Sequence, residues 1–411
     1  MARRCSTTCL PFNQALYPDL VADPKAFRQD LARFFRQMPE LFPEGFAQGY
    51  LMKDRRLSRK LGLLLRRIRL KATGDTFTVR PSFALPYMAG RAGDVSGPLF
   101  LRAFGVPFWA LARVFGRDHS YWYRVEVALG RCSVAGTTLR RAGVPAHLLA
   151  DEHHQPRDGQ KNYLATTVGA GCCLGAALAQ TAGADDLLEA YSVFKAEARD
   201  VQPGYAPQTV SADGWAATHQ AWLALFPLVV TLRCFLHGWL NVRSRGKLSG
   251  GFAQLSERVW RAYRARTRRS FGQRMRRLWE WAQANVSAAW VLEQVKKLCG
   301  RAKEYGLAYA HQGGHRTSNA LDRVMRAMNR YFDDGQHLHR SAQACTRHVR
   351  AWALLYNFRP WHPAVARANG GWRCPAERLN QHRYHDDWLQ SLLASASLAG
   401  YRRRIAPPPT P

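Results

Sequence analysis

The chain has 411 residues, of which 47% are apolar, enough to form two or three hydrophobic cores, and this excludes disorder over most of its length. Its 60 Lys and Arg against 29 Asp and Glu give a formal net charge of +31, spread along the sequence, so a polyanion is the expected partner. Nucleic acid is favoured over a membrane surface, because basic and aromatic residues alternate over several segments, and solubility by excess charge is the alternative.

The cysteines and the apolar runs indicate the cellular compartment in which the protein is expected. Nine scattered cysteines, an odd number, argue against a disulfide framework. The longest apolar run, Ala221 to Val230, is too short to span a bilayer, and the N-terminus lacks the apolar stretch of a secretory signal. We therefore expect a soluble cytoplasmic protein that does not associate with membranes.

The first hundred residues predict two small units. Residues 1–60 read as a basic helical region, in which Asp23 and Pro24 begin a helix. Residues 61–104 read as a β-hairpin module, because Ile68 and Leu70 alternate with arginines before a turn at 73–76.

Residues 105–144 contain helix-starting and helix-ending residues at the spacing expected of a helix-turn-helix. Pro107 opens one helix, while Ser120 and Ser133 cap two more, which end at Gly130 and Gly143. The second helix would then be the recognition helix that reads the major groove. Its candidate DNA contacts are Tyr121, Tyr123 and Arg124, while Trp122 and Val125 pack inward. An ordinary three-helix connector is the alternative.

An alternation of strands and helices follows in residues 145–242. Strands are predicted at 147–153, 163–169, 172–179, 209–213 and 228–237, and helices at 185–201 and 214–225. Three antiparallel strands, then helix, strand, helix and strand, is the order of an RNase H-like mixed sheet. The sequence thus predicts an α/β fold of this kind.

The remainder of the chain is expected to be helical. Residues 243–315 predict an all-helical insertion, with helix over 252–300, and residues 316–358 predict the last helices of the core, beginning with 319–332. Residues 359–411 form a C-terminal segment whose Pro-rich end is expected to be disordered.

Two apolar strands end in an aspartate. Asp151 follows His-Leu-Leu-Ala, and Asp213 follows Thr-Val-Ser-Ala and precedes Gly214, which lets the backbone turn. Acidic residues from different elements that converge on one sheet edge can hold two divalent ions for phosphodiester chemistry. Glu152 and Glu197 are either part of such a site or surface carboxylates.

A third acid is expected on a helix after the insertion. Asp322 lies about one turn into the helix that begins near Asn319, although a first-turn aspartate that stabilises the helix dipole is the alternative. Glu304, Asp333 and Asp334 are weaker candidates, because none follows such a helix start.

These residues, in this order, carry a resemblance. Asp151, Asp213, the Cys234-Phe235-Leu236-His237 motif on the following strand, and an acid after a helical insertion resemble the catalytic domain of Mutator-like DDE/DDD transposases, including those of bacterial insertion sequences. The resemblance covers Pro145 to about Phe358. One departure is that many relatives have Glu as the third acid, where this chain would have Asp322.

The resemblance implies a site and a reaction. Asp151 would bridge two Mg²⁺ ions, which Mn²⁺ can replace, while Asp213 and Asp322 would each bind one. Cys234 and His237 would be structural or would contact DNA, since a zinc site needs two further ligands. The implied function is a bacterial DNA transposase that binds terminal inverted repeats as a homodimer or higher oligomer, cuts DNA and joins it to target DNA.

Further basic residues would hold DNA phosphates. Arg233 beside the catalytic elements, and Arg268 and Arg269 in the insertion, are the representative candidates, although a solvated surface charge is the alternative for each. Two other functions remain open. They are an RNase H-like nuclease or resolvase that does not join strands, and a DNA-binding regulator derived from a transposase.

Overall fold

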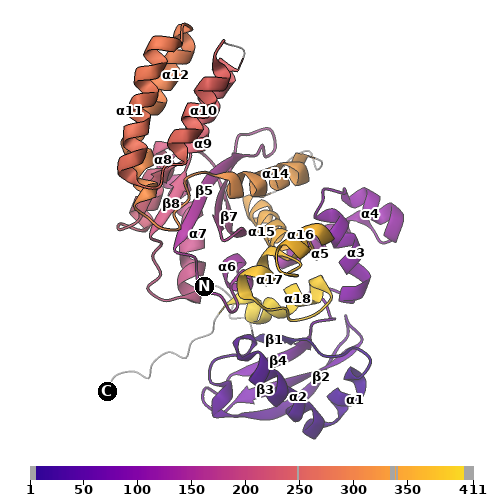
Figure 1. Ribbon diagram of the computed structural model, residues 1–411. Helices are drawn as coiled ribbons and strands as arrows, with labels where there is room; N and C mark the ends of the chain where they lie inside the picture. Colours follow the sequence, from indigo (N-terminus) through magenta and orange to yellow (C-terminus); the bar gives the residue numbers. More distant parts are fainter. Residues whose placement is uncertain (1–5, 248–249, 334–337, 339–340, 402–411) are drawn as a thin grey trace.

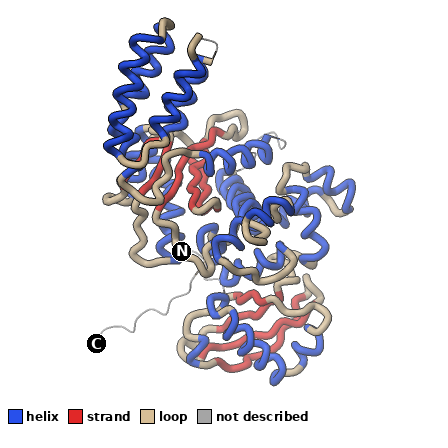
Figure 2. Tube along the Cα trace, viewed as in Figure 1, coloured by secondary structure: helices blue, strands red, loops and turns tan. Residues whose placement is uncertain are grey.

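The computed structural model shows a mixed α/β protein with two β-sheets (Figures 1 and 2). The structure describes residues 6–247, 250–333, 338 and 341–401. The Pro-rich end that the sequence predicts to be disordered, residues 406–411, lies outside them. Within the described ranges, no helix is both long and apolar enough to cross a bilayer.

The N-terminal unit is a four-stranded sheet covered by two helices. Its strand order is β1-β4-β3-β2, with β1 parallel to β4 and the other pairs antiparallel. The predicted hairpin is confirmed, since Ile68 of β3 pairs with Phe77 of β4. The elements of this unit are β1 (Thr7–Leu10), α1 (Tyr17–Ala22), α2 (Pro24–Gln37), η1 (Pro39–Leu41), η2 (Phe46–Gln48), β2 (Tyr50–Ser58), β3 (Leu63–Leu70) and β4 (Thr76–Pro81).

Two strands of this sheet lie in the region that the sequence predicts to be helical. The division at residue 60 separates β2 from β3, although these two strands pair along their whole length. The physical reason is that β2 is an edge strand rich in charged residues, whose apolar alternation is weak, and that β1 pairs with a strand about 70 residues away.

Four helices follow the first sheet. They are α3 (Ala92–Arg102), α4 (Phe108–Phe115), α5 (His119–Leu129) and α6 (Val134–Thr138). The last three match the predicted helices, with two corrections. Asp118, not Ser120, caps α5, because its carboxylate accepts a hydrogen bond from the Ser120 amide. The helix that Ser133 caps ends at Thr138 rather than at Gly143.

The second sheet has five strands in the order β7-β6-β5-β8-β9. The strands β5, β6 and β7 are antiparallel neighbours, while β8 and β9 are parallel to β5. The elements are β5 (His147–His154), β6 (Tyr163–Gly169), β7 (Cys172–Ala179), α7 (Ala184–Val201), β8 (Thr209–Ala212), α8 (Ala216–Leu225), β9 (Val230–Arg233) and α9 (Phe235–Gly246).

Helices cover both faces of this sheet. On one face, Leu148 and Val210 pack in a cluster with Phe194 of α7 and Trp222 of α8. On the other, Leu149 packs in a cluster with residues of α14 (Asn319–Asp333) and α15 (Ala342–Phe358). The sheet is therefore the middle layer of three, and its strand ends are the place where a site can open.

A helical arm projects from this layered core (Figure 1). The arm has its own hydrophobic cluster, which includes Trp239, Val259, Leu278 and Val295. The predicted helical insertion is confirmed, as α10 (Phe252–Tyr263), α11 (Arg268–Asn285), α12 (Ala289–Gly300), α13 (Ala302–Gly306) and η3 (Leu307–Tyr309).

The C-terminal segment packs between the two sheets. The Ser397 hydroxyl accepts a hydrogen bond from the Cys9 amide of β1 and donates one to the Leu41 carbonyl. This segment therefore connects the N-terminal unit to the rest of the protein. Its elements are α16 (Pro363–Ala368), α17 (Pro375–Asn380), α18 (Trp388–Ser395) and η4 (Ser397–Gly400).

Candidate active site

Three neighbouring strands of the five-stranded sheet bring a polar residue to the same edge. The strands β8 and β9 end there, whereas β5 does not end at Asp151 as expected but continues to His154, paired with β6. The parallel strands β5 and β8 pair Leu149 with Ser211. Asp151 and Asp213 each lie two residues after this pair, so they lie at the same height in the sheet. The strands β8 and β9 are also parallel, which brings Cys234, the residue after β9, to this edge. The register of the sheet thus gathers three of the residues that the sequence singles out.

Asp151 lies in an environment that opposes its negative charge. Burial raises its pKa to about 7, and the neighbouring carboxylates of Glu152 and Asp213 contribute to the rise. The backbone amide of Glu152, which donates a 2.9 Å hydrogen bond, and the His237 ring act in the opposite direction. Burial and the neighbouring carboxylates therefore outweigh these two contacts and destabilise the ionised form of Asp151.

Glu152 belongs to the same edge, although it is turned toward the helices. Its carboxylate accepts hydrogen bonds from the Tyr191 hydroxyl of α7 at 2.6 Å and from the Thr218 hydroxyl of α8 at 2.8 Å. Burial raises its pKa. It is therefore not a surface carboxylate. Glu197, by contrast, is ion-paired with Arg350 in the interior.

The Cys-x-x-His motif begins a helix. Cys234 is the N-cap of α9, so the predicted fifth strand over 228–237 is too long, and β9 ends at Arg233. Burial raises the pKa of the Cys234 thiol, but hydrogen bonds with His237 and Ser318 outweigh burial and leave it below the usual value. The hydrogen bond with Cys234 raises the pKa of His237 to about 9. The two side chains thus stabilise each other's charged forms.

Asp322 is connected to this motif through Ser318, a residue that the sequence reasoning used only as part of a polar helix start. The Ser318 hydroxyl donates to the Asp322 carboxylate at 2.9 Å, and the Ser318 amide donates to the Cys234 sulfur at 3.2 Å. The helix that carries Asp322, α14, packs against β5 and β6. The third candidate acid is therefore near the edge, but its carboxylate is bound by a serine.

The described residues do not include three or more His, Cys, Asp or Glu side chains arranged to hold a metal ion. Asp151 and Asp213 supply oxygen ligands of the kind that a divalent cation prefers, and the Asp213 carboxylate contributes to the raised pKa of Asp151. No zinc site forms around Cys234 and His237 among these residues either.

Arg233 and Glu304 form an ion pair beside Asp213. The Arg233 Nε lies 2.7 Å from the Glu304 carboxylate, and its Nη2 donates to the Gly214 carbonyl at 3.1 Å. Gly214 has a φ of 101°, and a Cβ there would lie 2.4 Å from the Arg233 guanidinium carbon. The guanidinium thus packs on the turn after Asp213, and the positive φ of Gly214 favours glycine there. Glu304 serves as its partner, Asp333 is exposed at the end of α14, and Asp334 lies outside the described residues.

The proposed recognition helix, α5, is mostly buried. Trp122 and Val125 pack inward as predicted. The Tyr121 hydroxyl donates to the Ala89 carbonyl, and the Tyr123 ring lies edge-on to Phe108. Arg124 is exposed on the surface. Only one of the three predicted DNA contacts is therefore fully open to solvent.

Arg268 and Arg269 are exposed at the start of α11, in the arm. With Gly272, Gln273 and Arg276 they line an open cavity of about 660 Å³. These residues lie on the arm and not at the strand ends, so the structure does not bring them together with Asp151.

Comparison with known proteins adds no family to this geometry. No protein-family model matches the chain, and no curated protein matches it.

Proposed function

We propose that this protein is a DNA transposase with an RNase H-like catalytic core. The single observation that carries the proposal is the pair of carboxylates, Asp151 and Asp213, that the adjacent parallel strands β5 and β8 bring to one edge of the sheet, where the Asp213 charge adds to the rise of the Asp151 pKa. The strand order, with three antiparallel strands followed by two parallel ones, supports the RNase H-like part of the proposal. The charge of +31 supports a DNA substrate.

The carboxylates would hold divalent cations, with Mg²⁺ the expected ion. Bound Mg²⁺ supplies a nucleophile at neutral pH and stabilises charge on the phosphoryl oxygens. Asp151 and Asp213 would provide oxygen ligands, and Asp322 would join them once its carboxylate leaves the Ser318 hydroxyl. The positive charge of protonated His237 lowers the pKa of Asp151 and so would favour its anionic, metal-binding form.

The reaction would consist of two displacements at phosphorus. In the first, a water oxygen bonds to the phosphorus at the transposon end, and the departing 3′ oxygen leaves as a hydroxyl. In the second, this 3′-hydroxyl oxygen bonds to a phosphorus of the target DNA, and the 3′ oxygen of the target strand leaves. Neither step needs a covalent protein intermediate.

The test is cleavage and joining of linear DNA that carries the inverted repeats bracketing the gene, with Mg²⁺ present. We expect both products with the natural protein and neither with Asp151→Asn or Asp213→Asn. Asp19→Asn, an exposed change on α1, is the matched control and should retain both. Cleavage by either active-site variant at the natural rate would refute the proposal, and cleavage without joining would favour a nuclease or resolvase.

A second candidate function is a DNA-binding regulator that does not catalyse. It is favoured by the hydrogen bond from Ser318 to Asp322, which holds the third carboxylate apart from the other two. This function predicts DNA binding by the natural protein and by Asp151→Asn alike, with neither cutting DNA in Mg²⁺ or Mn²⁺.

A further inference from the structure

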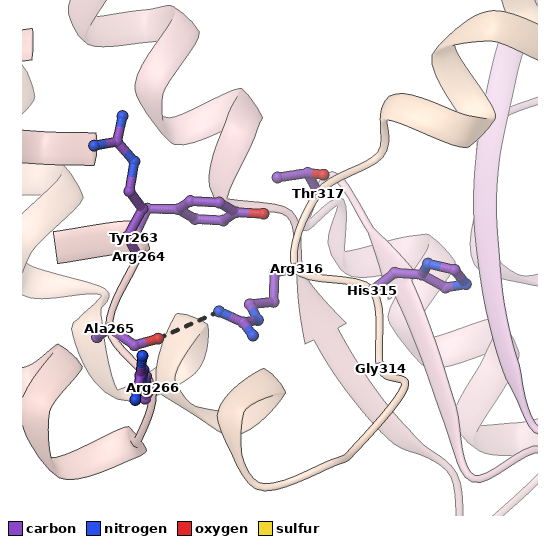
Figure 3. Close-up of a pocket in the computed structure, with 8 residues that line it drawn as sticks. All are labelled: Tyr263, Arg264, Ala265, Arg266, Gly314, His315, Arg316 and Thr317. Atoms are coloured by element: carbon purple, nitrogen blue, oxygen red, sulfur yellow. Dashed lines mark hydrogen bonds between the residues drawn. The ribbon is translucent and has the colours of Figure 1, made fainter. Parts of the chain in front are cut away.

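A basic cleft opens where the arm meets the loop that leads to α14 (Figure 3). Its volume is about 640 Å³. Its lining consists of Tyr263, Arg264, Ala265 and Arg266 from the arm, and Gly314, His315, Arg316 and Thr317 from the loop. Three of these eight residues are arginines, and none is acidic, so the cleft is suited to an anion.

The cleft is held in shape by contacts across it. The Arg316 guanidinium stacks on the Tyr309 ring at 4.4 Å and points toward the Ala265 carbonyl, with a separation of 3.5 Å. The Tyr309 hydroxyl donates to the Tyr263 carbonyl at 2.6 Å. Figure 3 shows Tyr263, Arg316 and Thr317 directed toward one another. The arm and the loop thus form one preorganised surface, which does not have to assemble when a ligand binds.

The arginines at the rim are available to a ligand. Arg264 and Arg266 are exposed, and in the part of the chain that the structure describes neither forms an ion pair with a carboxylate. Exposed guanidinium groups without a carboxylate partner can donate paired hydrogen bonds to phosphate oxygens.

The cleft is continuous with the candidate active site. The Arg316 carbonyl accepts a hydrogen bond from the Phe235 amide at 3.0 Å, and Phe235 also stacks on Tyr263. Ser318, two residues after Arg316, holds both Cys234 and Asp322. An anion in the cleft would therefore lie on the path that leads from the arm to the carboxylates.

We propose that this cleft binds the sugar-phosphate backbone of the DNA strand that enters the candidate active site, through Arg264, Arg266 and Arg316. This inference rests on the proposed function, and it assigns the arm a role in holding the strand next to the catalytic edge. Each phosphate contact releases counterions, so the binding is salt-dependent and independent of sequence.

The test compares two double variants by fluorescence anisotropy with a labelled DNA duplex of random sequence that carries a nick. Arg264→Gln with Arg266→Gln should weaken binding roughly tenfold near physiological salt, and lower the slope of log affinity against log salt by about 2. Arg36→Gln with Arg59→Gln removes the same charge from exposed positions of the N-terminal unit and should change binding less than threefold. Circular dichroism checks that both variants fold.

Equal losses in the two variants, or natural affinity in the cleft variant, would overturn the inference, because the cleft would then be no better than any basic surface. Equal competition by polyglutamate would overturn it too, since the cleft would then bind acidic peptides. These results are independent of cleavage. If Asp151→Asn abolishes cleavage while the cleft variant binds DNA normally, the inference fails and the proposed function stands. If Asp151→Asn still cleaves, the proposed function fails, and the anisotropy comparison alone decides whether the cleft binds DNA.

Discussion

Buried acids occur in two very different settings in this protein. Glu126, in α5, is fully buried and lies beside Arg102 at 3.2 Å, and it also contacts Tyr331 and His348. Asp151 is bordered mainly by other acids, so burial and repulsion raise its pKa to about 7. The first acid is compensated and stabilises the interior. The second is left uncompensated by its surroundings, which is typical of a site that binds a cation or performs chemistry.

The largest effect on stability should come from removing the charge of Glu126, the acid that Arg102 compensates. Glu126→Gln leaves the buried Arg102 without its anionic partner, and we expect the free energy of unfolding to fall by about 3–5 kcal/mol. Urea denaturation measures this. Glu257→Gln, in an exposed pair with Arg261, is the control and should cost less than about 1 kcal/mol. Equal losses of stability in the two variants would show that burial of an ion pair does not determine how much it contributes.

Removing the charge of Asp151, which its surroundings leave uncompensated, should instead stabilise the fold. The folded-state pKa of Asp151 lies above its ordinary value of 3.8, so the fold favours the protonated form and loses stability as the pH rises from about 4 to 7. In metal-free buffer, Asp151→Asn should raise the free energy of unfolding at pH 8 by up to about 4 kcal/mol. At pH 4 it should have little effect. The same change in the free energy of unfolding at both pH values would contradict the raised pKa of Asp151.

Magnesium should relieve the same repulsion. At pH 8, MgCl₂ at tenfold excess over its Kd should stabilise the natural protein by about 1.4 kcal/mol, seen as a rise in Tm. Sodium chloride of matched ionic strength should not reproduce the rise, and Asp151→Asn should abolish it. A rise that persists in Asp151→Asn would place the bound ion elsewhere.

The smallest effect concerns the thiolate of Cys234. Because the hydrogen bond with His237 lowers the pKa of this thiol, His237→Gln should shift its ionisation to higher pH. Absorbance at 240 nm, with Cys234→Ser subtracted, follows the thiolate. Burial raises the pKa of Cys173, Cys299 and Cys374 to about 12 and also raises that of Cys172, so these thiols add little near neutral pH. An unchanged titration would show that His237 does not stabilise the thiolate.

The five-stranded sheet could be predicted because local sequence patterns mark its strands. Apolar runs followed by a charged residue located β5 and β8, and the parallel register of these strands places Asp151 and Asp213 at the same height in the sheet. The strand β9 was predicted to be too long, since Leu236 and its apolar neighbours continue the pattern beyond the N-cap at Cys234.

Contacts between distant segments could not be read from the pattern. The burial of α5 depends on its packing against α15, which lies more than 200 residues later. The hydrogen bond between Ser318 and Asp322 depends on where Cys234 anchors the start of α14. The charged strand β2 is visible only through its pairing with β3.

The anchor between Cys234 and Ser318 also defines the arm as a closed loop. These two residues are 84 positions apart in the sequence, yet they are hydrogen-bonded, so the intervening chain leaves the core and returns to it at one point. The entropic cost of closing a flexible loop grows only with the logarithm of its length, by about 0.6 kcal/mol for each doubling. Lengthening or shortening the distal part of the arm should therefore be nearly neutral for the core, as long as its root is preserved.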